Sequence, residues 1–114
     1  MAITNPATRE ALATYLGTLG AYISFHTADP GTTGANEASG GGYGGRKLTN
    51  WTGGTADGTV TGSEVPIDVP AGTWAWCGIW SALSGGTFVE KFPVNSNTLS
   101  AAGTIKVTPT LTIS

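Results

Sequence analysis

Two stretches of this sequence decide the fold: YISFHTADPG at residues 22–31 and VPAGTWAWCGIW at residues 69–80. Each combines a run of strand length with a turn rich in glycine and proline. In the first stretch Asp29, Pro30 and Gly31 predict a turn, because proline presets φ and glycine accepts a positive φ. The second stretch is apolar on both faces, with Trp74, Trp76 and Trp80 on one of them, which is typical of a central strand.

The first twenty residues predict a short helix. Asn5 is a suitable N-cap and Pro6 suits the first helical position, while Gly20 marks the end. An apolar stripe follows the helical spacing i, i+3, i+4, i+7, and we expect it to pack against the rest of the protein. Its members are Leu12, Tyr15, Leu16 and Leu19.

Further strands are predicted at residues 47–51, 65–69, 88–94 and 104–113, with Pro66 and Pro109 indicating a sheet edge or a bulge. About seven strands and one helix result. The predicted fold class is mainly β, a single-domain β-sandwich or jelly-roll-like fold with one short N-terminal α-helix. Residues 1–20 form the N-terminal arm and helix, and residues 21–114 form the sandwich domain, with both parts in one folding unit.

Residues 31–45 predict a long loop, because seven of them are glycine and Tyr43 is the only large side chain. A loop of this length in a small domain is usually functional or mobile. Its glycine cluster lacks the lysine and the following helix that a phosphate-binding loop requires.

Composition excludes several classes of function. Only 11% of the residues are charged, the net charge is −2, and the five basic residues are scattered, so we expect no nucleic-acid partner. No apolar run is long enough for a membrane span, and the N-terminus does not resemble a signal peptide. We therefore expect no membrane partner and folding in the cytoplasm. Cys77 is the only cysteine, and we interpret it as a small buried side chain.

The sequence offers little for catalysis. His26 and Asp29 have the residue types of a base and its orienting acid, but Asp29 suits backbone capping in the turn better. A metal site formed by His26, Asp29 and Glu37 has too few clustered carboxylates. We therefore predict no enzyme, no catalytic residue, no cofactor and no metal.

The four tryptophans leave two interpretations open. They form a core and a subunit contact, or some of them form a platform on which sugar rings stack. The first interpretation is favoured, and a glycan is the weaker alternative. The candidate interface residues are Tyr43, Arg46, Trp51, Trp74 and Trp76.

Four elements occur in one order along almost the whole chain: a short helix, HTADPG at residues 26–31, GGGY at residues 40–43, and VPAGT followed by GIW at residues 69–80. In this the chain resembles small bacteriophage virion structural proteins of the tail-fibre or minor tail protein type. The resemblance implies a virion protein whose partners are major capsid or tail proteins.

Within the virion, two locations are open. No coiled coil, triple β-helix or collagen-like repeat forms a fibre shaft here, so the sequence favours an accessory capsid-decoration or minor capsid protein that reinforces the shell. The alternative is a minor tail or tail-fibre component with receptor glycan binding through surface tryptophans. In both cases we expect a homo-oligomer, with a trimer as the first candidate.

Overall fold

The computed structural model describes residues 3–53 and 57–113. Its helix α1 (Pro6–Leu19) begins as predicted. The Asn5 side chain accepts a hydrogen bond of 3.0 Å from the Ala7 N–H, Pro6 occupies the first turn, and Gly20 follows the last helical residue. The backbone donors at this helix end are thus partly satisfied by the cap.

The orientation of α1 differs from the prediction. Ala13 is fully buried, whereas Leu12, Tyr15 and Leu19 are 42%, 63% and 44% exposed, and Leu16 alone of the expected stripe packs against the core. Small side chains explain the difference. At Gly17 a Cβ atom would already lie 3.1 Å from the Trp51 ring, so this face of the helix approaches the protein closely. The larger apolar side chains are left on the solvent side.

The central sheet has four strands in the order β2-β1-β6-β7, all antiparallel. They are β1 (Tyr22–His26), β2 (Lys47–Leu48), β6 (Gly72–Trp80) and β7 (Phe88–Leu99). Residues 23–26 of β1 are buried on both faces. One face meets the core, where Ile23 stands opposite Ile79 and Phe25 opposite Cys77. The predicted central position of β6 is confirmed.

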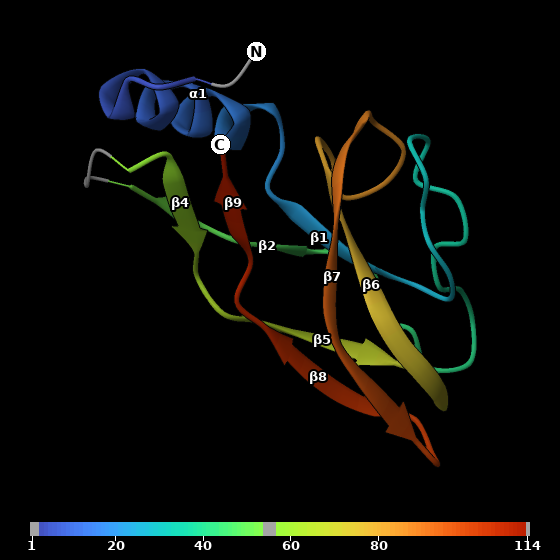
Figure 1. Cartoon of the computed structure of the whole chain (residues 1–114). Helices are drawn as coiled ribbons and strands as arrows, with labels where there is room; N and C mark the ends of the chain where they lie inside the picture. Colours follow the sequence, from blue (N-terminus) through green and yellow to red (C-terminus); the bar gives the residue numbers. More distant parts are fainter. Residues whose placement is uncertain (1–2, 54–56, 114) are drawn as a thin grey trace.

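Two smaller sheets complete the fold (Figure 1). One contains β3 (Trp51–Thr52), β4 (Thr59–Gly62) and β9 (Thr110–Thr112), and α1 lies against β4 and β9. The other pairs β5 (Val65–Val69) with β8 (Gly103–Val107). Val65, Ile67 and Val69 alternate with exposed residues and enter the core. The mainly β, single-domain fold with one helix is confirmed, although its strands are divided among three sheets.

Pro109 lies where the last strand changes sheets. β8 ends at Val107 and pairs with β5, whereas β9 begins at Thr110 and pairs with β4. A proline inside a continuous strand would remove one ladder hydrogen bond, so the chain separates into two strands at this residue. The interruption was predicted, but the exchange of sheets was not.

The hairpin of β6 and β7 contains an irregularity that redirects a tryptophan. Trp74 stands opposite Asn97 and Trp76 opposite Pro93, so β7 carries extra residues between these two pairs. Such a bulge bends and twists a strand. Trp74 packs edge-on against Phe25 in the core, with ring centroids 6.0 Å apart. The expectation that Trp74 shares one face with Trp76 and Trp80 is therefore wrong.

Candidate functional site

The glycine-rich segment after β1 folds back onto the central sheet. The Asp29 carboxylate accepts a hydrogen bond of 2.8 Å from the Gly31 N–H, and Gly31 has a φ of +65°. Further along, Glu37 forms a β-bridge with His26, and the Ala38 N–H donates to the Phe25 carbonyl. The predicted loop is thus held against β1, because backbone hydrogen bonds join residues before the Asp29 turn to residues after it.

Arg46 fixes the far end of this segment. Its guanidinium binds the Glu37 carboxylate through two atoms, at 2.8 and 3.1 Å, and also donates to the carbonyls of Ala82 and Gly85. The Tyr43 hydroxyl donates to the same carboxylate at 2.9 Å. Burial opposes ionisation of Glu37, but the bonds from Arg46 and Tyr43 outweigh it and keep its pKa below the usual value.

His26 lies in a continuous chain of hydrogen bonds that runs from Trp80 to Ala35. The Trp80 indole N–H donates to Ser24 Oγ at 2.9 Å, Ser24 Oγ lies 2.7 Å from His26 Nε2, and His26 Nδ1 lies 2.7 Å from the Ala35 carbonyl. Because a carbonyl only accepts, Nδ1 carries the proton and Nε2 accepts from the serine. Burial lowers the pKa of His26, so the neutral ring is favoured.

The sequence-derived pair of His26 and Asp29 is not formed. Asp29 instead binds Lys91 Nζ at 2.7 Å as well as the Gly31 amide. The Lys91 hydrogen bond is the main cause that lowers the pKa of Asp29. Across residues 3–53 and 57–113, no three histidine, cysteine, aspartate or glutamate side chains gather as a metal site.

Each of the four tryptophan rings has a neighbour in the chain. Trp74 is only 3% exposed, Arg46 lies over Trp80, and Lys91 Nζ lies 5.1 Å from the centre of the Trp76 ring. Trp51 donates from its indole N–H to the Gly20 carbonyl. Arg46 is itself 8% exposed, so burial leaves Arg46 and Trp74 little area for a partner. For Tyr43, Trp51 and Trp76, all half-buried, an interface role stays a prediction.

A groove lies between two strands that follow each other in sequence but belong to different sheets. β7 and β8 meet at residues 100–102 and diverge from there, as Figure 1 shows. The groove between them has a volume of about 600 Å³. It is lined by Trp74, Phe92, Pro93, Val94, Asn95, Asn97, Ile105, Lys106, Val107, Thr108 and Thr110.

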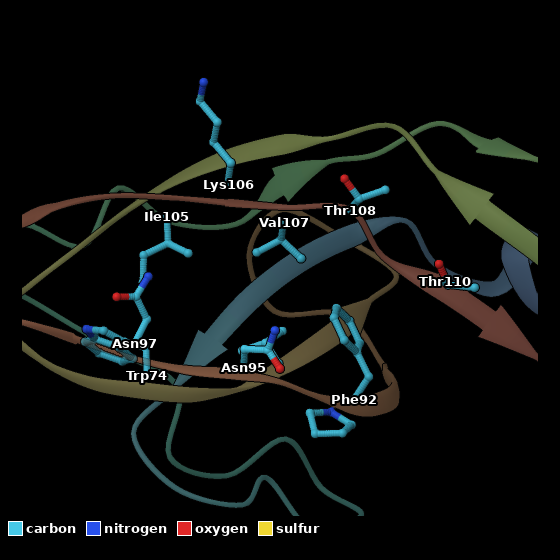
Figure 2. A pocket seen from close by; sticks show the side chains of 11 residues that line it. Trp74, Phe92, Asn95, Asn97, Ile105, Lys106, Val107, Thr108 and Thr110 are labelled. Atoms are coloured by element: carbon cyan, nitrogen blue, oxygen red, sulfur yellow. The ribbon is translucent and has the colours of Figure 1, made fainter.

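The groove has an apolar floor and a polar rim. Figure 2 shows Ile105 and Val107 directed from β8 toward the β7 side, where Phe92 projects into the same space. Lys106, the only charged lining residue, points away from the opening. The lining contains no acid–base pair, and its chemistry suits apolar groups, with amide and hydroxyl side chains available for polar contacts.

Sequence reasoning missed this groove and most of the bonds beneath the loop. The sequence did not predict that Glu37 binds Arg46, or that Ser24 binds His26. The nearest signals were the two prolines, Pro93 and Pro109, because a proline in a strand pattern indicates an interrupted edge. Neither proline, however, indicates which strand lies across the opening.

The fold defines a small β-rich domain with a capped helix, a glycine-rich loop held by Arg46, and a groove between β7 and β8. The model of the family described as podophage GP4 fiber I protein gp80 matches residues 2–114, and the chain belongs to this family. No curated protein matches the sequence. The family is one of bacteriophage fibre proteins, so the match fits the tail-fibre alternative better than capsid decoration. Within the described part of the chain, no helix is long and apolar enough to cross a membrane.

Proposed function

We propose that this chain is a structural subunit of a podophage tail fibre and that it works by protein–protein contact, without catalysis. The family match over nearly the whole chain supports a fibre component. The low content of charged residues, 11%, suits a protein whose surface contacts other subunits in an assembly. Its partners are then other virion proteins, with tail proteins favoured over the major capsid protein.

The outer face of α1 is the observation that carries this proposal. It presents Leu12, Tyr15 and Leu19 to solvent and no charged side chain. The two charged residues of the helix are engaged within the chain: Arg9 donates to the Ile3 carbonyl at 2.7 Å, and Glu10 accepts from the Gly58 N–H at 3.1 Å. Contiguous exposed apolar side chains mark an interaction site.

A second copy of the chain is the partner we assign to this face. Leu12, Tyr15 and Leu19 are spaced by three and four residues, the spacing of side chains along a helix–helix seam. Symmetric oligomers place identical patches together, and a patch without charge does not repel its own copy. The net charge of −2 lies elsewhere on the chain, so this face adds no local charge repulsion to the contact between two copies. The proposal leaves the trimer as the first stoichiometry to test.

Two other roles have less support. A catalytic role for His26 would require it to leave the chain of bonds through Ser24 and Ala35. A glycan platform would require a bare aromatic face, and Arg46 and Lys91 already lie over two of the indole rings. We therefore propose neither an enzymatic nor a glycan-binding function.

Quantitative mass spectrometry of purified virions tests the proposal. The virions are separated into heads and tails after disruption, and the copy number of this chain is measured against the major capsid protein in each fraction. We expect a few copies to a few tens of copies per virion, all with the tails. Hundreds of copies with the heads would instead show capsid decoration, and absence from virions would overturn the structural role.

A further inference from the structure

One edge of strand β8 carries backbone donors and acceptors that no neighbouring strand of the described chain binds. In the described part of the chain β8 pairs with β5 alone, so one side of β8 has no neighbouring strand. A ladder of two strands is smaller than most sheets, which have about four to six strands. An exposed edge of this kind presents N–H and C=O groups that another strand can bind.

The register shows which residues face that free edge. Asp68 stands opposite Thr104, and its carbonyl accepts from the Gly44 N–H at 2.8 Å, on the side of β5 away from β8. The Asp68–Thr104 pair therefore does not exchange ladder hydrogen bonds. Such pairs alternate in an antiparallel ladder, so Lys106 belongs to the same class. The backbone groups of Thr104 and Lys106 consequently point toward the free edge.

Pro66 supports this assignment independently. It stands opposite Lys106 and has no N–H, so it cannot supply the donor that a hydrogen-bonded pair needs. Proline is tolerated where its nitrogen faces away from the partner strand. Two separate observations, on Asp68 and on Pro66, thus give the same orientation for β8.

The opposite wall of the groove is closed to strand pairing. β7 is also an edge strand, but Pro93 interrupts its donors and the bulge before Asn97 breaks its regular spacing. Edge strands are often protected from pairing in this way. The two edges that border the groove are therefore unequal, and only β8 offers an uninterrupted ladder.

We propose that the β8 edge and the groove beside it bind one extended polypeptide segment of another virion protein, added as a third strand to the β5–β8 sheet. This rests on the proposed function as a fibre subunit. The backbone of the segment pairs with Thr104 and Lys106. Its alternate side chains are apolar and uncharged, because they enter the space lined by Phe92, Val94 and Ile105.

The chemistry of the groove favours this occupant. A strand supplies backbone donors and acceptors on one side and an apolar side chain at every second residue, which matches both the edge and the floor. Within the described residues, every strand is already paired with at least one neighbour in its own sheet. A strand of a second copy could therefore enter the groove only together with that neighbour, whereas one extended segment of a different polypeptide enters alone, and this is the occupant we assign.

The substitution Lys106→Pro tests the backbone contact. It removes the outward N–H, and the proline already present at residue 66 shows that this pair accepts one. Lys106→Ala is the matched control, because it removes the charge and keeps the N–H. We expect virions grown with Lys106→Pro to carry this chain at a level about tenfold lower than virions with Lys106→Ala. Equal incorporation of the two folded variants would overturn the inference.

Hydrogen exchange of the unaltered protein decides the matter if Lys106→Pro does not fold. We expect the amides of Thr104 and Lys106 to exchange at least about tenfold more slowly in virions than in the isolated protein. Unchanged exchange would refute the added strand. Slow exchange already in the isolated protein would show pairing between copies and would overturn the assignment to another polypeptide. If the unaltered chain is absent from virions, the proposed function fails, not the groove alone.

Discussion

The guanidinium of Arg46 lies 3.7 Å from the centre of the Trp80 ring while its nitrogen atoms bind Glu37 and two backbone carbonyls. One side chain thus connects the glycine-rich segment, the central strand β6 and the turn that follows it. A planar guanidinium is suited to this, since it stacks on an aromatic face and keeps its donors free at the edge.

Arg46→Ala is expected to lower the free energy of unfolding by about 3–5 kcal/mol, because it leaves the Glu37 carboxylate partly buried without its cation. Arg46→Lys should recover only part of this loss, because an ammonium group cannot bind the carboxylate through two atoms. Urea unfolding measures both. Lys47→Ala, at an exposed neighbouring residue, is the control and should change stability by less than about 0.5 kcal/mol. Equal effects at the two positions would contradict the stabilising role of the Arg46–Glu37 ion pair.

Stability should fall as the pH decreases below about 6.5. Burial holds the pKa of His26 in the folded protein below its ordinary value of 6.5, so the unfolded chain binds more protons in this range. The loss begins near the unfolded pKa and continues down to the folded one. Glu37, whose pKa is also lowered, adds a loss only below 4.5. Thermal melting between about pH 7 and pH 5 isolates the histidine contribution.

His26→Gln is the matched variant for this measurement. It should lower stability at neutral pH, because the bond to Ser24 or to Ala35 is weakened, and it should remove the decline between about pH 7 and pH 5. A decline of the same size in the variant would assign the effect to another group.

Gly34→Ala should destabilise the protein more than Gly31→Ala. Both glycines have a positive φ, but a Cβ atom at Gly34 would lie 2.5 Å from the Trp80 ring, whereas nothing lies within 4 Å at Gly31. The backbone cost of about 1–2 kcal/mol is common to both, and overpacking adds about 1–3 kcal/mol at Gly34. Denaturant unfolding of the pair measures the difference. Equal losses would show that the Trp80 ring moves aside freely.

Tyr15→Glu should reduce self-association without unfolding the protein, because the side chain is exposed and the charge would be buried only between copies. Sedimentation equilibrium over a range of concentrations measures the effect. Leu83→Glu is the control, since Leu83 is 61% exposed in the turn between β6 and β7. A protein that remains monomeric, or one in which both variants associate equally, would rule out the helix face as the contact.

Local chemistry made part of the fold predictable. The cap at Asn5, the turn at Asp29 and the central position of β6 each depend on residues close together in sequence. The orientation of α1 was not predictable in this way. Hydrophobicity favoured Leu12 and Tyr15 as the buried face, but the close approach at Gly17 decided the packing. This approach depends on Trp51, which lies far along the chain.

The Arg46–Glu37 ion pair and the groove between β7 and β8 depend even more strongly on residues that are distant in sequence. Glu37 was considered as a metal ligand and Arg46 as an interface residue, yet the structure pairs them with each other. Their spacing of nine residues carries no periodic signal, because the glycines between them set the path of the chain. The groove requires a bulge in β7 and an exchange of sheets after β8, and neither follows from alternation within one strand.

The reactivity of Cys77 reports on the opening of the central sheet. It is the only thiol in the sequence, it has no exposed surface, and burial raises its pKa. A thiol reagent therefore reacts with it only when β6 separates from β1 and β7. The labelling rate measures the opening of the central sheet directly. A bound neighbour that stabilises the central sheet would lower the labelling rate. Assembly can therefore be followed on the chain without introducing a substitution.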